Sequence, residues 1–388
     1  MERIIMHIDV NNAFLSWSAI DLLNKGSKYD IRNSYAVIGG DEKARKGIVL
    51  AKSTPAKKQG VVTAETLYSA KKKCPALRIY PPNFEFYHLM SNRMFELLYK
   101  YTPDIEIASI DECYLDYGKI KKINGDELEF AKKIQKEIYD TLGFTVNIGI
   151  ANNKLCAKMA SDFSKPNKIH TLYDYEIKLK MFPLKIGDLF GVGKKTAKVL
   201  NEMGIYTIGD LANYNLEKLQ KKFKNQAVNL INIANGIDNS EVISYKTDPK
   251  CISTSITLPN DAYNLTDIKE VLKEQAEKIG LELKREKKYA YVIAAILKNK
   301  DFVNTSKQLK LINPTNDSKE IYEIALKQME YIWDKVGVRL VGIRVSNLVS
   351  NYYFQGSILE NNLKDEKLEN VINSIKEKYG TDKIKNTY

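Results

Sequence analysis

The feature that most constrains this chain is a cluster of carboxylates inside an otherwise apolar segment, residues 105–117. The segment reads Ile-Glu-Ile-Ala-Ser-Ile-Asp-Glu-Cys-Tyr-Leu-Asp-Tyr, which predicts a buried strand or two strands joined by a turn. Yet Asp111 and Glu112 lie in its middle, and Asp116 follows. Carboxylates are rarely buried unless they are paired or bind a metal. The cluster is therefore either the exposed tip of a hairpin or a metal site, and the segment alone is compatible with both.

A further carboxylate stands near the N-terminus. Residues 4–8 predict a short strand that ends at Asp9, and residues 10–23 have the apolar periodicity of a helix. An aspartate between a strand and a helix is a common metal ligand, and it is also a common helix cap. From this position alone, the cap is favoured.

The order of elements up to residue 170 indicates an α+β sheet layered with helices. Further strands are predicted at residues 35–40, 47–51, 78–80 and 144–150, and helices at 64–75, 87–101, 126–142 and 151–163. A split β-α-β unit would bring Asp9 and the turn with Asp111 and Glu112 onto neighbouring central strands.

Residues 186–211 have the pattern of a helix-hairpin-helix, in which two helices flank the tight turn Gly191-Val-Gly193. The glycines let backbone N–H groups approach a phosphate at the start of the second helix, whose dipole favours an anion. Lys194 and Lys195 add positive charge there. The pattern predicts contact with the DNA backbone without reading of the base sequence. A plain pair of helices is the alternative.

Residues 240–348 form another α+β region. Strands are predicted at 250–258, 289–297, 302–311 and 338–346, and helices at 266–284 and 318–333. The order strand-helix-strand-strand-helix-strand is the ferredoxin-like arrangement. Lysines and arginines on these strands and their connections predict a basic sheet face that can bind phosphates in a groove.

Composition narrows the class of partner. A chain of 388 residues predicts two to four domains. Its formal net charge of +12 favours a polyanion, with nucleic acid first and an anionic membrane second. The four cysteines are far apart and only three histidines occur, which argues against a zinc site or a disulfide framework. Because no long apolar span or signal peptide appears, we expect a cytoplasmic protein without a membrane partner.

The three carboxylates Asp9, Asp111 and Glu112 make a site of hard oxygen ligands, which suits Mg²⁺, with Mn²⁺ as a substitute. Two such ions about 3.5–4 Å apart can clamp the attacking and leaving oxygens of an in-line phosphoryl transfer. Asp9 and Asp111 would bridge both ions, and Glu112 would bind the ion at the attacking 3′-hydroxyl. Lys57 and Lys165 are candidates to offset the charge of a triphosphate.

Five motifs in this order carry a specific resemblance: residues 7–14, 108–116, 147–154, 158–167 and 190–194. Through them the chain resembles a Y-family (translesion) DNA polymerase of the bacterial polymerase IV type. The resemblance implies a palm with fingers at residues 1–170 (fingers about 18–77) and a thumb at 171–240. It also implies a little finger at 241–350 and a tail at 351–388. The implied activity is low-fidelity, template-directed synthesis of DNA by two-metal phosphoryl transfer, with no proofreading exonuclease.

The same resemblance assigns roles at the reaction centre. Asp9, Asp111 and Glu112 match the catalytic metal carboxylates, and the carbonyl of Val10 matches a backbone ligand. Phe14 matches the aromatic steric gate, whose ring occupies the space that a ribose 2′-hydroxyl would need.

The residues for the triphosphate depart from the family in part. Lys165 matches the triphosphate-binding lysine of the palm. Where the fingers of the family supply a tyrosine and an arginine, this chain has Thr54 and Lys57. Lysine is a point charge without the guanidinium fork, so a looser or differently arranged grip is expected.

The expected partners are primer-template DNA, a dNTP and a sliding clamp, and the protein is expected to be a monomer. DNA contact is assigned to Gly191, Gly193, Lys194 and Lys195. The segment Gln355-Gly-Ser-Ile358-Leu359 resembles a bacterial clamp-binding peptide, although the usual final Phe is absent. The alternative is an apolar bump on a flexible tail.

Two other functions compete with the polymerase. One is a catalytically inactive DNA-binding accessory protein of the DNA damage response. The presence of all three carboxylates, Asp9, Asp111 and Glu112, argues against it. The other is a different palm-type nucleotidyl transferase or cyclase, which needs no path for DNA.

Overall fold

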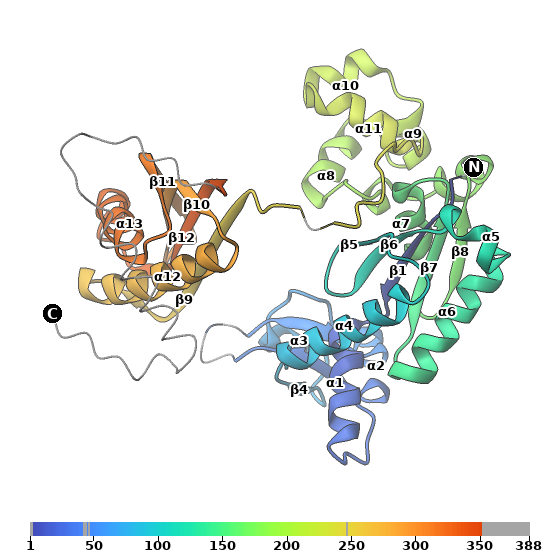
Figure 1. Ribbon diagram of the computed structural model, residues 1–388, viewed down its shortest axis with the longest axis horizontal. Coiled ribbons are helices and arrows are strands. Elements are labelled where there is room, and N and C mark those ends of the chain that lie inside the picture. Colours follow the sequence, from blue (N-terminus) through green and yellow to red (C-terminus); the bar gives the residue numbers. More distant parts are fainter. Residues whose placement is uncertain (1–2, 42–44, 46, 246, 351–388) are drawn as a thin grey trace. The chain divides into compact units, whose positions relative to one another are not determined.

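The computed structural model describes residues 3–41, 45, 47–245 and 247–350. The chain divides into two compact units, Met1–Thr247 and Asp248–Tyr388 (Figure 1). Among the described residues, the first unit contains a five-stranded and a three-stranded sheet, the second unit contains a four-stranded sheet, and each unit has its own hydrophobic core. We describe them separately.

A five-stranded sheet forms the centre of the first unit, and we call it, with the helices packed on it, the palm. Its strand order is β5-β6-β1-β7-β8. Strand β1 pairs antiparallel with both β6 and β7, so that Asp9 lies opposite Glu112 on one side and Asn147 on the other. The predicted neighbouring of the two acidic segments is therefore confirmed. The strands are β1 (Ile5–Val10), β5 (Ile105–Ile107), β6 (Glu112–Asp116), β7 (Val146–Ala151) and β8 (Ile169–Leu172).

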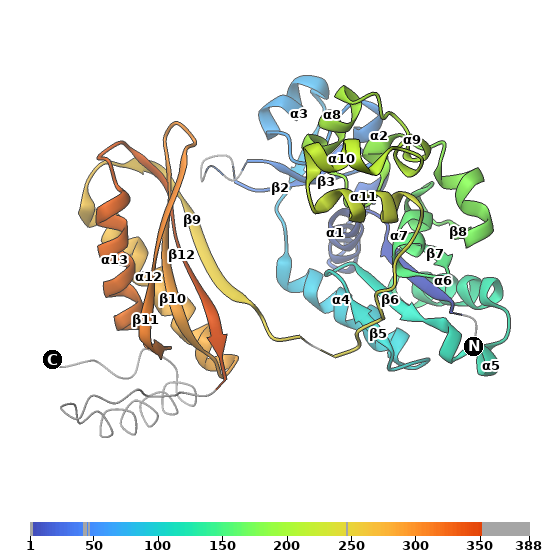
Figure 2. The ribbon, with the colours of Figure 1, turned by 90° about the horizontal axis from the view of Figure 1, so that it is seen from above.

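The two faces of this sheet are covered by different helices (Figure 2). Met6 and Ile8 of β1 pack in the core with helices α4 (Phe84–Tyr99) and α6 (Glu127–Leu142). Because side chains alternate along a strand, His7 and Asp9 point to the other face, which helix α7 (Lys154–Asp162) covers. Helix α7 lies so close to β7 that a Cβ at Gly149 would come within 2.0 Å of the carbonyl oxygen of Ala157.

We call the smaller sheet β3-β2-β4, with its helices, the fingers. Strand β2 pairs antiparallel with β3 and parallel with β4. Helix α1 leads into this region from the palm, and the short helix α2 was not among the predicted elements. The elements are α1 (Ala13–Asn24), β2 (Ala36–Gly39), β3 (Val49–Lys52), α2 (Thr54–Lys58), α3 (Leu67–Lys73) and β4 (Arg78–Tyr80).

Short helices α8 to α11 make up the thumb (Figure 2). One prediction is wrong here: the first helix of the helix-hairpin-helix is a single 3-10 turn, Ile186–Asp188, because Leu189 is already extended. Gly191 has φ +91°, which favours glycine, and Gly193 caps the second helix. The thumb helices are α8 (Lys194–Glu202), α9 (Ile208–Ala212), α10 (Leu216–Phe223) and α11 (Gln226–Ala234).

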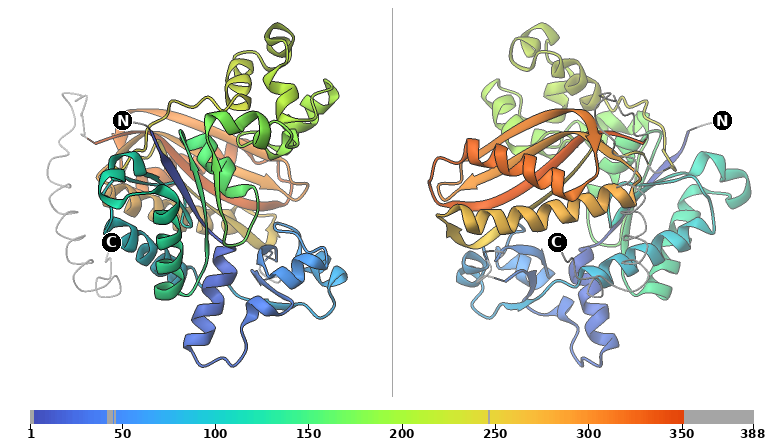
Figure 3. Two further views of the ribbon diagram at one scale, coloured as in Figure 1. Left: turned by 90° about the vertical axis from the view of Figure 1, so that its right-hand side faces the viewer. Right: turned by 60° about the vertical axis from the view of Figure 1, so that its left-hand side comes forward.

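The second unit is a four-stranded antiparallel sheet with two helices on one face (Figure 3). The strand order is β11-β10-β12-β9, so β12 separates the two strands that α12 connects, and the unit is split as predicted. The elements are β9 (Cys251–Ala262), α12 (Leu265–Arg285), β10 (Tyr289–Asn299), β11 (Asn304–Thr315), α13 (Ser318–Ile332) and β12 (Val338–Val349).

Short helical turns and one further helix complete the first unit. They are 3-10 turns Ile31–Asn33, Tyr117–Lys119 and Asp174–Glu176, helix α5 (Lys121–Asn124) and the π-helical turn Ile177–Met181. Across the residues that the structure describes, every helix is too short or too polar to cross a lipid bilayer.

Candidate active site

The end of β1 brings the N-terminal carboxylate beside the acidic turn. Asp9 is only 5% exposed and lies opposite Glu112, the first residue of β6. The backbone N–H of Val10 donates to the carbonyl oxygen of Asp111 at 3.0 Å, which ties the turn to the strand. Asp116 lies at the other end of β6, opposite Ile5, and so is remote from Asp9 along both strands.

One cavity of about 350 Å³ contains most of the predicted reaction centre. It lies over the ends of β1 and β6 and extends to the fingers through Leu50 and Ala51. The lining residues are Asp9, Val10, Asn12, Ala13, Phe14, Leu50, Ala51, Asp111, Glu112, Lys158, Asp162 and Lys165. The structure thus brings together the three carboxylates, the steric-gate candidate and the palm lysine.

Lys158 is a charged neighbour of the carboxylates that the sequence interpretation missed. Its side chain is 9% exposed, and its Nζ lies 3.2 Å from Oδ2 of Asp9 and 3.1 Å from Oε1 of Glu112. Although burial acts in the opposite direction, the negative charges of Asp9, Asp162 and Glu112 raise the pKa of Lys158. A permanent ammonium therefore lies between two of the three carboxylates.

Lys165 reaches the same aspartate from the loop after α7. Its Nζ lies 2.9 Å from Oδ2 of Asp9 and 2.9 Å from Oδ1 of Asp162. Burial opposes ionisation, but these two carboxylates raise the pKa of Lys165. Asp162 was not among the predicted site residues, and it holds Lys165 from the last turn of the same helix that carries Lys158.

His7 supports Glu112 from beneath. The ring is fully buried, its Nδ1 lies 2.8 Å from Oγ of Ser161, and its Nε2 lies 3.3 Å from Oε2 of Glu112. The geometry of the second contact is outside that of a regular hydrogen bond, and burial lowers the pKa of His7, so the ring is not a permanent cation as Lys158 is. Contact with His7, aided by Lys158, lowers the pKa of Glu112 to about 2.

Asp111 has the opposite electrostatic environment. Burial raises its pKa, and the like charges of Asp9 and Glu112 act in the same direction, against a hydrogen bond from Ser109. A carboxylate whose negative charge is disfavoured in this way gains from a cation nearby.

The ring of Phe14 lines the cavity and is held in an aromatic cluster. It stacks on Tyr87 with a centroid distance of 4.8 Å and an interplanar angle of 11°, and it meets Phe84 edge-on at 5.9 Å. Tyr87 is fully buried, and its hydroxyl lies 2.6 Å from Oγ of Ser18. The ring is therefore backed by a rigid neighbour.

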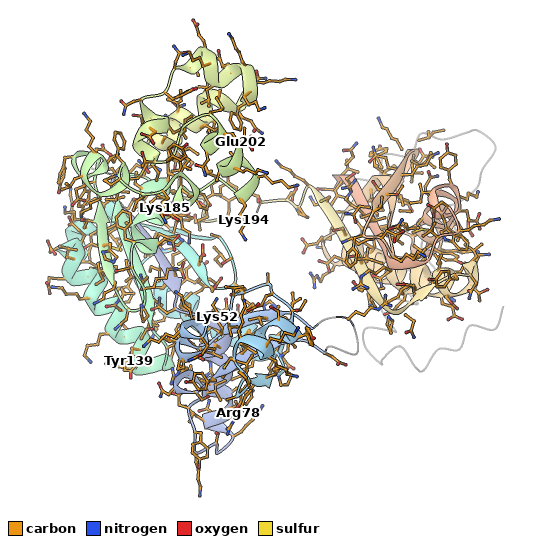
Figure 4. The ribbon with its side chains drawn as sticks, turned by 180° about the vertical axis from the view of Figure 1, so that it is seen from behind. Lys52, Arg78, Tyr139, Lys185, Lys194 and Glu202 are labelled. Atoms are coloured by element: carbon orange, nitrogen blue, oxygen red, sulfur yellow. The ribbon has the colours of Figure 1, made fainter. Side chains whose placement is uncertain are left out.

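The two predicted triphosphate residues of the fingers do not join this cavity. Thr54 and Lys57 are exposed on α2, and neither is among the lining residues. Lys52, labelled in Figure 4, lies beside the start of α1, because Asn12 donates from Nδ2 to its carbonyl oxygen at 2.5 Å.

The predicted DNA contacts of the thumb lie together at one helix end. Gly193 is the N-cap of α8, and Lys194 and Lys195 are its first two residues. All three are exposed, and Lys194 is labelled at the start of this helix in Figure 4. The predicted clamp-binding residues Gln355, Ile358 and Leu359 lie outside the described residues.

The donor set fits a hard divalent cation in kind. The acidic side chains that line the cavity offer only oxygen ligands, as Mg²⁺ prefers. In the described part of the chain, however, no three acidic, His or Cys side chains are close enough together to hold one ion. The ammonium groups of Lys158 and Lys165 contact oxygens of Asp9 and Glu112 instead. The carboxylates that are predicted to bind the metal are thus already paired with positively charged groups.

Three family models match the chain. The model of the impB/mucB/samB family matches residues 8–162, and the model of its C-terminal domain matches residues 249–358. A model described as the thumb domain of DNA polymerase-iota matches residues 187–238.

Curated proteins and solved structures agree with these matches. The chain is 44% identical over 387 residues to a protein named DNA polymerase IV from Clostridium acetobutylicum, covering 99% of this chain and 97% of that protein. It is 33% identical to DNA polymerase IV 2 of Bacillus subtilis, covering 98% and 92%. Among solved structures, a Y-family DNA polymerase chimera superimposes with a TM-score of 0.78 at 26% identity, covering 90% of this chain and 100% of that chain.

Proposed function

The chain belongs to the impB/mucB/samB family, that of the Y-family DNA polymerases, and on this premise we propose which of its residues carry out the reaction. It is a DNA-directed DNA polymerase of the translesion class that depends on a divalent metal and binds primer-template DNA and dNTP. No comparison supports the inactive accessory protein. What remains to be assigned is the role of each side chain.

We assign metal binding to Asp9, Asp111 and Glu112, with the carbonyl oxygen of Val10. The assignment is supported by the two paired strands that bring these carboxylates to one cavity. Two Mg²⁺ ions, or Mn²⁺ in their place, would activate the primer 3′-hydroxyl and neutralise the phosphates when bound. His7 and Lys158 keep Glu112 ionised, since both lower its pKa.

Lys165 balances the charge of the incoming triphosphate. Its support is the position of its ammonium group at the cavity, 2.9 Å from Asp9, together with a raised pKa that keeps it protonated. When the triphosphate enters, Lys165 exchanges a carboxylate partner for phosphate oxygens. Phe14 excludes a 2′-hydroxyl because its ring cannot move back through Tyr87, on which it stacks.

DNA contact is assigned to the N-terminus of α8 in the thumb. The exposed N-cap Gly193 leaves backbone N–H groups free of a side-chain cap, and Lys194 and Lys195 supply charge beside them. Such an arrangement binds phosphates without regard to base sequence. Gly191 serves the preceding turn, where its positive φ is required.

Primer extension tests the catalytic assignment. Wild type and the variant Asp111→Ala plus Glu112→Ala are compared with Mg²⁺, a primer-template and all four dNTPs. We expect extension by the wild type and a loss of at least about 10³-fold in the variant, because the charge on the reacting oxygens is then unsupported. Equal extension by both proteins would overturn the assignment. Equal binding of primer-template by both confirms that the variant is folded.

The tail is proposed to bind a sliding clamp through Gln355, Ile358 and Leu359, and the polymerase itself to act as a monomer. The support is the sequence pattern alone. Deletion of the residues after Tyr353 is expected to abolish capture by the clamp and to leave extension without the clamp unchanged. Sedimentation of the full chain tests the monomer. Clamp capture by the truncated protein would contradict the assignment.

A further inference from the structure

Two buried asparagines connect strand β1, which carries Asp9, to the loop that carries Lys165. Asn147 is fully buried on β7, directly opposite Asp9, and Asn11 is 6% exposed just after β1. Nδ2 of Asn11 donates to Oδ1 of Asn147 at 3.0 Å. Neither residue lines the cavity, and neither has a role in the mechanism described above.

The side chain of Asn147 uses all of its hydrogen-bonding capacity. Its Nδ2 donates to the carbonyl oxygens of Ser161 at 2.9 Å and Ser164 at 2.6 Å. Its Oδ1 accepts from Asn11 and from the backbone N–H of Lys168 at 3.1 Å. An amide can make two donations and about two acceptances, so this one is saturated. It joins the end of α7 to both ends of the loop at residues 164–168.

Asn11 adds a third attachment within that loop. Its Oδ1 accepts from the backbone N–H of Asn167 at 2.8 Å and from the hydroxyl of Thr145 at 2.9 Å. Asn167 has φ +57°, a left-handed conformation that asparagine adopts more readily than most residues. The loop is thus attached on both sides of Lys165, whose ammonium group reaches Asp9.

We propose that Asn147 and Asn11 are positioning residues that fix the Lys165 loop against β1, so that the Lys165 ammonium group faces the triphosphate. This inference rests on the proposed role of Lys165. A lysine side chain is a point charge on a flexible four-carbon stem, so the side chain alone does not fix where its ammonium group lies. Direction comes from the backbone that carries it, and a displacement of about 1 Å can cost up to about 100-fold in rate.

A double-mutant cycle separates positioning from a general effect on folding. The variants are Asn147→Leu, Lys165→Ala and the combination, and the measured quantity is the Kd of dNTP on a complex with Mg²⁺ and a dideoxy-terminated primer-template. We expect each single variant to raise this Kd about tenfold, with kcat changing less than KM in normal extension. In the Lys165→Ala background, Asn147→Leu should add less than about twofold, because both act through one group.

Two controls accompany the cycle. Thr145→Val removes the other hydrogen bond onto Oδ1 of Asn11 without touching the loop, so its dNTP Kd should stay at the wild-type value. Should Asn147→Leu fail to fold, Asn11→Ala replaces it in the cycle, since it removes the attachment at Asn167 together with the contacts to Asn147 and Thr145, and Thr145→Val accounts for the last of these. Circular dichroism verifies the fold of each variant.

The outcomes distinguish the two levels of the proposal. An equal rise of the Kd from Asn147→Leu in both backgrounds would overturn the positioning role and leave the assignment of Lys165 intact. A wild-type Kd for Lys165→Ala would overturn the assignment of Lys165 and, with it, this inference. A tenfold rise for each single variant without further rise in the combination supports both.

Discussion

The lysines of the palm and the lysines of the fingers are held in different ways. Lys158 and Lys165 lie against buried or half-buried carboxylates, and these carboxylates raise their pKa values. In the fingers, Lys57 is exposed on α2. Burial and the nearby charge of Lys57 lower the pKa of Lys52, whose Nζ donates to Oγ1 of Thr63 at 2.8 Å.

This difference indicates a division of labour. A lysine that is fixed by ion pairs and by the backbone beneath it presents its charge at a defined point, whereas an exposed lysine contributes little to any single geometry. We therefore expect the palm to determine where the triphosphate lies. The fingers are expected to add general attraction from their basic surface.

The largest effect is expected at the carboxylate that both palm lysines share. Asp9→Asn removes the charge that attracts Lys158 and Lys165 and that we assign to metal binding, and we expect kcat for primer extension to fall by about 10³-fold. Asp116→Asn, at the far end of β6, is the matched control and should stay within about twofold. If the Asp9→Asn variant retained a tenth of wild-type activity, the palm carboxylate that pairs with both lysines would not have the dominant role that this comparison gives to the palm.

Lys158→Met is expected to act on stability first. It leaves Asp9 and Glu112 without their shared ammonium group, and loss of one partner from a buried ion pair costs about 3 kcal/mol. Urea unfolding, followed by the fluorescence of Trp17 in a Trp333→Phe background, measures this loss in EDTA. Mg²⁺ should restore more stability to the variant than to the wild type, because the ions take the place of the missing charge. An equal gain in both proteins would contradict this role.

A direct comparison of the two regions uses Lys165→Ala and Lys57→Ala. Removal of a charge-assisted hydrogen bond costs about 1.5–3 kcal/mol, so KM for dNTP should rise at least about tenfold in Lys165→Ala. For the exposed Lys57, we expect a rise below about threefold. The test is which variant raises KM for dNTP more, and a larger rise in Lys57→Ala than in Lys165→Ala would contradict the proposed division of labour.

The smallest effect concerns a carboxylate that stabilises the fingers. Glu65 accepts from Lys73, Ser69 and the N–H of Val62; these bonds outweigh burial and lower its pKa from 4.5 to about 2. Because the folded state favours the ionised Glu65 carboxylate, this group stabilises the fold above pH 4.5, and the contribution is lost as the pH falls toward 2. The difference in Tm between wild type and Glu65→Gln should therefore be present at pH 6 and close on acidification. A gap independent of pH would exclude this origin.

The backbone of the palm site was predictable because it depends on strands. Apolar runs on either side of Asp111 indicated two paired strands, and the strand before Asp9 then had a natural neighbour. Lys158 was missed because it stands among Ala157, Met159 and Ala160, where helical periodicity suggests a core face. Only the packing of α7 on the sheet shows that this face meets the carboxylates.

In the fingers the sequence holds a local signal for α2, whereas in the thumb the periodicity is ambiguous. Ser53 accepts from the N–H of Ala56 and Pro55 follows at the helix start, a capping pattern that predicts α2, on which Thr54 and Lys57 are exposed. In the thumb, a single 3-10 turn stands where a helix was predicted, since helical periodicity over so few residues does not distinguish the two.

The most direct test is a count of bound metal ions. Mn²⁺ binding is measured by electron paramagnetic resonance on the complex with a dideoxy-terminated primer-template and dNTP. For the wild type, we predict two tightly bound ions per polymerase. For Asp111→Ala plus Glu112→Ala, we predict at most one, held by the triphosphate itself. Two equally tight ions in the variant would contradict the assignment of these carboxylates as the metal ligands.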